Sequence, residues 1–168
     1  MTRCDLRVGM IGLGALGLPI AANLRRADVP MRVHTRSRNA ERDPSLLGAI
    51  TCATPAEAAE GVDVLLLCVS DNAAVEAVLF GANGASDHLA AGSVVVDCST
   101  IAPATAIASA QRLARQDVHY LDAPVTGGTE GAKAGSLTVL VGGKPAALDR
   151  ARPVLEIIGG SIHHFGPV

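Results

Sequence analysis

Six residues near the start of the chain have the spacing of a loop that binds a dinucleotide. The run Gly12-Leu13-Gly14-Ala15-Leu16-Gly17 matches the pattern G-x-G-x-x-G and stands between an expected strand and an expected helix. In such a loop the first glycine permits a tight turn, the second lets the backbone approach a pyrophosphate, and the third lets the helix pack on the strand. The start of the helix offers free N–H groups to the anion. We expect these six residues to bind a dinucleotide; a glycine-rich turn without a ligand is the alternative.

The end of the second expected strand indicates which dinucleotide. Sites that prefer NAD usually place Asp or Glu there, to hold the ribose 2′-hydroxyl. This chain has Thr35, Arg36, Ser37 and Arg38 instead, with no acidic residue before Glu41. Because the guanidinium fork of arginine fits phosphate oxygens, these four residues favour a 2′-phosphate, and therefore NADP over NAD. The alternative is a solvated strand end.

A second cluster of hydrogen-bond donors follows a later strand. Thr126 carries a hydroxyl, and Gly127 and Gly128 leave backbone N–H groups open. Such a group of donors suits a carboxylate, so we expect these three residues to bind the acid end of a small-molecule substrate. The alternative is a glycine-rich turn that requires positive φ. Ser99 and Thr100 follow another buried strand; they would also reach the ligand edge of the sheet, or cap the helix before Pro103.

Alternating strands and helices position these residues. We expect strands at residues 6–11, 31–35, 49–53, 62–69, 93–97, 118–123, 137–141 and 159–165. We expect helices at residues 15–27, 55–59, 72–80, 103–116 and 146–157, with a segment at 38–47 that is polar, then helical and weakly determined, and loops elsewhere, including 131–135. This order predicts an α/β fold of the Rossmann type: a doubly wound, mainly parallel sheet with helices on both faces. Residues 1–168 then form one dinucleotide-binding domain.

Composition excludes several classes of protein. Apolar residues make up 49% of the 168 residues and charged residues 18%, which excludes a disordered chain. A net charge of −2 gives no basic surface for nucleic acid. The longest apolar run is too short for a membrane span, and the first residues lack the form of a signal peptide. We therefore expect a cytoplasmic protein with neither nucleic acid nor membrane as a partner.

Cysteine and histidine spacing does not indicate a metal site. The four cysteines, Cys4, Cys52, Cys68 and Cys98, form no Cys-x-x-Cys pair and fit reduced, mostly buried thiols. His163 and His164 are adjacent, and on a strand they would point to opposite faces. We expect no metal.

Three stretches together resemble the β-hydroxyacid dehydrogenases, which include 3-hydroxyisobutyrate, tartronate semialdehyde and 6-phosphogluconate dehydrogenases. They begin with Gly9-Met10-Ile11-Gly12, with Asp97-Cys98-Ser99-Thr100, and with Asp122-Ala123-Pro124-Val125-Thr126-Gly127-Gly128. The resemblance implies reversible oxidation of a small 3-hydroxy acid by hydride transfer. It implies that Thr100 contacts cofactor and substrate, and that Val69 and Ser70 contact the cofactor. The family usually has Ser where this chain has Thr126, and often Pro where it has Ser70.

The resemblance also implies a catalytic lysine, which this chain does not provide. Neither Lys133 nor Lys144 matches the family's position, so we expect no catalytic residue within the chain. A C-terminal helical domain, which carries that lysine and the contacts of a homo-oligomer, would lie outside these residues, and the chain alone would be inactive. Two alternatives remain: the cofactor domain of an imine reductase, and a non-catalytic module that binds NADP.

Overall fold

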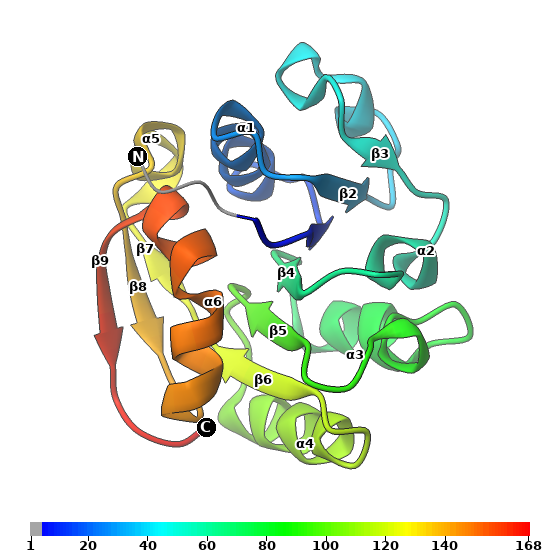
Figure 1. Ribbon diagram of the computed structural model, residues 1–168, viewed down its shortest axis with the longest axis vertical. Helices are drawn as coiled ribbons and strands as arrows, with labels where there is room; N and C mark the ends of the chain where they lie inside the picture. The colour runs from blue at the N-terminus through cyan, green and yellow to red at the C-terminus, as the bar shows by residue number, and fades with distance from the viewer. Residues whose placement is uncertain (1–4) are drawn as a thin grey trace.

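The computed structural model describes residues 5–168, so Cys4 lies outside the described part (Figure 1). Its main sheet has six parallel strands in the order β3-β2-β1-β4-β5-β6. The strands are β1 (Val8–Ile11), β2 (Met31–His34), β3 (Ile50–Thr51), β4 (Val64–Leu67), β5 (Val94–Asp97) and β6 (His119–Asp122). Strand order reverses between β1 and β4, the point at which such sheets bind ligands beyond their carboxyl ends.

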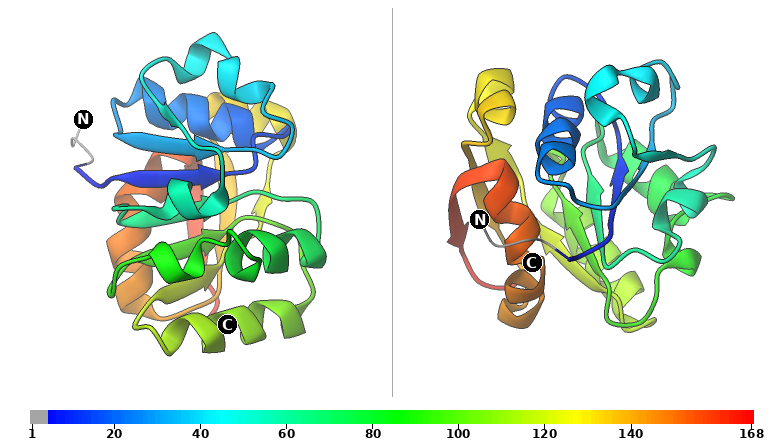
Figure 2. Two further views of the ribbon diagram at one scale, coloured as in Figure 1. Left: turned by 90° about the vertical axis from the view of Figure 1, so that its right-hand side faces the viewer. Right: turned by 45° about the horizontal axis from the view of Figure 1, so that its top comes forward.

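Helices cover both faces of this sheet, as Figures 1 and 2 show. One face carries α1 (Gly17–Arg26) and α6 (Pro145–Ile158), and the other carries α2 (Pro55–Ala59), α3 (Asn72–Phe80) and α4 (Pro103–Ala114). Side chains of β4 alternate between the two cores: Leu66 packs on the first face and Leu65 on the second, and both are fully buried. The predicted Rossmann-type α/β fold is confirmed.

The last strands differ from the expected arrangement. The strands expected at 137–141 and 159–165 are present as β8 (Leu137–Val141) and β9 (Gly159–His164), but they form a separate sheet with β7 (Val125–Thr126), which was not expected. β7 runs antiparallel to β8, and β8 parallel to β9. After β6 the backbone of Asp122 exchanges two hydrogen bonds with Gly142, and Pro124, which has no N–H, accepts one from Leu140. These contacts turn the chain away from the parallel sheet.

Two local predictions were wrong. Residues 131–135, expected as a loop holding Lys133, belong mostly to helix α5 (Gly128–Ala134). Several glycines hid this helix, because glycine disfavours helices. The segment at 38–47, expected to become helical, forms no α-helix within its described residues.

The polar segment at 38–47 forms two short 3₁₀ turns, η1 (Ala40–Arg42) and η2 (Pro44–Leu46). Within residues 5–168, no helix is both long and apolar enough to cross a membrane.

Candidate functional site

The glycine loop has the geometry that close approach of a ligand requires. Gly12 has a φ of +95°, and a Cβ there would collide with the carbonyl oxygen of Cys68. A Cβ on Gly17 would collide with the carbonyl oxygen of Gly12, so α1 packs directly against the loop. Gly14 differs: it is exposed, and a Cβ there would have no described atom within 4 Å. The first and third glycines therefore serve the fold, whereas the second leaves space open.

The start of α1 suits an anion. Leu16 precedes the helix, and no side chain caps it. The first turn contains no acidic residue, while Arg25 and Arg26 lie in the last turn. The partial positive charge of the helix N-terminus is thus directed at the space beside Gly14 without a competing carboxylate.

Glu41 folds back to the end of β2, a contact that the sequence analysis missed. Its carboxylate is buried and accepts a hydrogen bond from the backbone N–H of Thr35 (3.0 Å) and one from Nε of Arg38 (2.7 Å). The Glu41–Arg38 spacing of three residues was a signal for this ion pair. Both carboxylate oxygens are therefore engaged. A pocket of about 440 Å³ beside this pair is lined by Arg38, Glu41, Arg42 and Thr51.

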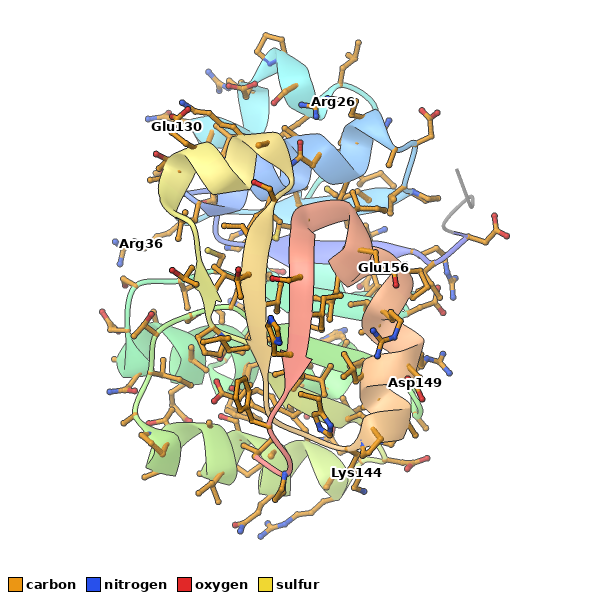
Figure 3. The ribbon with its side chains drawn as sticks, turned by 90° about the vertical axis from the view of Figure 1, so that its left-hand side faces the viewer. Arg26, Arg36, Glu130, Lys144, Asp149 and Glu156 are labelled. Atoms are coloured by element: carbon orange, nitrogen blue, oxygen red, sulfur yellow. The ribbon has the colours of Figure 1, made fainter. Side chains whose placement is uncertain are left out.

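Arg36 and Arg38 face different neighbours. Arg36 is exposed and projects from the side of the molecule on which Glu130 of α5 also lies (Figure 3). The pKa of Asp71, the N-cap of α3, is lowered mainly by a hydrogen bond from the backbone N–H of Ala74. Ser70 and the charge of Arg36 lower this pKa to a smaller extent. The charge of Arg36 thus acts on the β4–α3 loop, while Arg38 is paired with Glu41. The exposed Ser37 lies between them.

The loops after β4 and β5 are bonded to each other. The backbone N–H of Val69 donates to Oγ of Ser99 at 3.0 Å, and the N–H of Ala102 donates to Oδ1 of Asn72 at 2.8 Å. Ser70 and Thr100 are exposed beside these contacts. The N-cap of α4 is Ala102, without a side-chain bond, so the capping role considered for Thr100 is wrong.

A buried polar pair lies beneath these loops. Asp97, which is fully buried, accepts hydrogen bonds from the backbone N–H of Ser99 (2.9 Å) and from the hydroxyl of Tyr120 (2.8 Å). Burial raises the pKa of Asp97, and burial together with the nearby Asp97 raises the pKa of Asp122. Tyr120 is the only tyrosine in the sequence, a signal that the sequence analysis left unused.

The thiols at the same strand ends are not activated. Burial raises the pKa of Cys68 to about 11, and burial raises that of Cys98 as well. Both thiols stay protonated near neutral pH, and neither is suited to act as a nucleophile. No group of three or more potential metal-binding side chains occurs within residues 5–168.

The expected carboxylate loop lies at the junction of the second sheet and α5. Thr126, Gly127 and Gly128 are all exposed, and the two glycines have φ values of +127° and +62°. The alternative of a glycine-rich turn with positive φ is therefore correct for the backbone. The same turn leaves all three residues exposed to solvent. The buried Asn23 of α1 donates from Nδ2 to the carbonyl of Ala132 at 2.6 Å, which holds α5 on the helix that follows the glycine loop.

Neither lysine offers a free amino group at this loop. Lys133 is exposed and pairs with Glu130 at 2.8 Å. Lys144 precedes α6 and lines a cavity of about 490 Å³. That cavity lies at the start of β6, beside residues 117–119 and the final residues 166–168, and so away from the glycine loop.

Comparison with known proteins gives this geometry a context. Residues 7–166 match the family described as the NAD binding domain of 6-phosphogluconate dehydrogenase. The chain belongs to this family of NAD-binding domains. It is 38% identical over 161 residues to the 2-hydroxy-3-oxopropionate reductase of Escherichia coli K12, an alignment that covers 96% of this chain and 55% of the reductase.

Solved structures agree. The protein Psf3, solved with NADP⁺ and 2-OPP, is 36% identical with a TM-score of 0.90, and the match covers 95% of this chain and 56% of that one. The 3-hydroxyisobutyrate dehydrogenase of Mycobacterium tuberculosis, solved with L-serine, is 28% identical with a TM-score of 0.91, covering 98% and 56%. Solved imine reductases have the same fold. The chain spans about half the length of the curated relatives it matches.

Proposed function

We propose that this chain is the NADP-binding domain of an oxidoreductase that reversibly oxidises a small 3-hydroxy acid. The observation that carries the proposal is the glycine loop, in which Gly14 alone leaves space beside the uncapped start of α1. Residues 12–17 would hold the pyrophosphate, and Val69, Ser70 and Thr100 would line the rest of the cofactor. Bound NADP would supply the hydride acceptor of the reaction.

The preference for NADP rests on the end of β2. Arg36 is exposed there and available to a 2′-phosphate, together with Ser37 and the free edge of Arg38, while Thr35, the first of the four residues, is buried. Glu41 is the acid nearest in sequence, but its two oxygens are already engaged and its side chain is 3% exposed. It therefore does not offer a carboxylate to the ribose 2′-hydroxyl of NAD. The NADP⁺ bound by the related Psf3 supports this choice.

The substrate class rests on Thr126, Gly127 and Gly128, whose donors suit a carboxylate. A second, helical domain would complete the substrate pocket, supply the acid–base group and form a homo-oligomer. Two observations support this division: the chain spans 55% of the Escherichia coli reductase, and Lys133 is paired with Glu130 at the surface.

Two measurements test the proposal. Titration of the chain with NADPH and with NADH, followed by nicotinamide fluorescence, should give the lower Kd for NADPH. The full-length parent should reduce NADP⁺ with 3-hydroxyisobutyrate or a similar 3-hydroxy acid. An imine reductase, which the fold also fits, would instead oxidise NADPH with a cyclic imine and ignore the hydroxy acid. Tight NADPH binding with neither reaction would favour a non-catalytic module.

A further inference from the structure

A chain of hydrogen bonds connects β6, β5 and the loop after β4, which are neighbours in the sheet. It begins at Tyr120 of β6, whose hydroxyl donates to Oδ2 of Asp97 at the end of β5. The other oxygen of Asp97 accepts the backbone N–H of Ser99. Oγ of Ser99, a residue only 3% exposed, accepts the backbone N–H of Val69 in the loop after β4. Both loops are thus attached to one carboxylate.

The same chain of contacts reaches the glycine loop. A Cβ built on Gly12 would lie 3.1 Å from Cγ1 of Val69, so the Val69 side chain borders the turn that follows β1. Apart from Tyr120, the second residue of β6, each contact lies at or just after the carboxyl end of a strand. Together they span β6, β5, β4 and β1, the strands on both sides of the point where strand order reverses.

Stability alone is a poor explanation for a charged group in this place. Burying a carboxylate is unfavourable unless it is well paired, and apolar side chains fill the rest of these strands. Asp97 is fully buried among them, yet its contact with Ser99 acts on the segments that precede the exposed Thr100 and Ser70. The polar contacts therefore fix the shape of ligand-facing loops rather than fill the core.

We propose that Asp97 is a positioning residue for the nicotinamide half of the dinucleotide, acting through Ser99 on Val69 and held in place by Tyr120. This inference rests on the proposed function, because it requires a bound dinucleotide. In a sheet of this strand order the adenosine half lies over β2 and the other half over β4 and β5. Through Ser99 and Val69, Asp97 acts directly on the loops after β5 and β4, so its effect should be largest for ligands that contain nicotinamide.

The test compares a complete ligand with a half ligand. The variants Ser99→Ala and Tyr120→Phe each remove one contact of the series, and Ser99→Thr keeps the hydroxyl. Ser109→Ala is the matched control, since Ser109 is a serine 1% exposed in α4 whose hydroxyl has no hydrogen-bond partner within the described residues. Each purified chain is titrated with NADPH and with adenosine 2′,5′-bisphosphate, and its thermal midpoint is recorded.

We expect Ser99→Ala to weaken NADPH binding about tenfold and Tyr120→Phe about threefold, as the loss of one hydrogen bond predicts. Binding of the bisphosphate should stay within about twofold in every variant, because that ligand does not reach β5. Ser99→Thr should restore most of the affinity, and Ser109→Ala should behave as the wild type. If Ser99→Ala does not fold, the ratio of the NADPH affinity to the bisphosphate affinity is compared between Tyr120→Phe and Ser99→Thr. A lower ratio in Tyr120→Phe would support the positioning role, and equal ratios would overturn it.

Other outcomes separate the two proposals. Equal weakening for both ligands, or the same effect from Ser99→Ala and Ser109→Ala, would overturn the positioning role while leaving NADP binding intact. If the wild type prefers NADH, the choice of cofactor is wrong, and the series is run with NADH and adenosine diphosphate under the same criterion. A wild type that binds no dinucleotide would overturn both proposals.

Discussion

The two ends of the parallel sheet use aspartate in opposite ways. At the amino edge, where the strands begin, Asp63 precedes β4 and pairs with Arg7, which precedes β1. The Arg7 side chain lowers the pKa of Asp63, whose side chain is 22% exposed. At the carboxyl edge, where the strands end, Asp97 is fully buried, and burial raises its pKa.

This difference separates stability from binding. An exposed ion pair joins two strands and faces water, so its contribution is modest and concerns the fold alone. A buried carboxylate opposes folding when charged and must be retained for another reason. We infer that substitutions at the amino edge change the thermal midpoint, whereas substitutions at the carboxyl edge change cofactor affinity.

The largest effect is expected at Gly14. Because nothing described lies within 4 Å of a Cβ there, Gly14→Val should leave the thermal midpoint of the free chain within about 2 °C of the wild type. The added side chain would occupy the space of the pyrophosphate and should weaken NADPH binding about 100-fold or more. Fluorescence titration and thermal unfolding measure the two quantities.

Gly17→Ala is the contrasting variant, since its Cβ would collide with the Gly12 carbonyl and should destabilise the chain. Wild-type affinity in Gly14→Val would show that the phosphates bind elsewhere.

Arg36 should have the next largest effect. If it contacts the 2′-phosphate, Arg36→Ala should weaken NADPH binding about tenfold while NADH binding stays unchanged, because only NADPH carries that phosphate. Arg115→Ala, which removes an exposed arginine at the end of α4, controls for the change in net charge. Parallel titrations with both cofactors measure the ratio. Equal losses for NADPH and NADH would place Arg36 outside the phosphate site.

The amino edge should show the reverse behaviour. Asp63→Asn weakens the contacts with the Arg7 side chain and its backbone N–H, so the thermal midpoint should fall by about 2–4 °C. NADPH affinity should not change, since Asp63 lies at the far end of β4 from Val69. Thermal unfolding and NADPH titration of the same sample check both points. A weakened affinity would contradict the division between the two edges.

How far the sequence predicts this molecule also differs between regions. The glycine loop and the alternating strands depend on local patterns, and the fold inferred from them is confirmed. The partners of Asp97 and Glu41 could not be predicted as readily: Tyr120 lies 23 positions from Asp97, and Glu41 reaches Thr35 only because two 3₁₀ turns fold the segment back. The second sheet was missed because hydrophobic alternation identifies strands but not the sheet that each joins.

The smallest effect expected is on the pH dependence of stability, and it has opposite signs at the two edges. The folded pKa of Asp63 is lowered, so its contribution is present above the ordinary value of 3.8 and is lost as the pH falls through the lowered pKa. The folded pKa of Asp97, which faces Tyr120, Asp122 and Cys68, is raised, so its contribution is present below 3.8 and is lost as the pH rises through the raised pKa.

Thermal midpoints between about pH 3 and 7 should therefore show less acid destabilisation in Asp63→Asn than in the wild type. Asp97→Asn should instead flatten the decline on the alkaline side of 3.8, by about 1–2 °C in either case. If the thermal midpoints of the two variants changed with pH in the same way, the carboxylates of Asp63 and Asp97 would share one environment. That result would contradict the difference in burial between them.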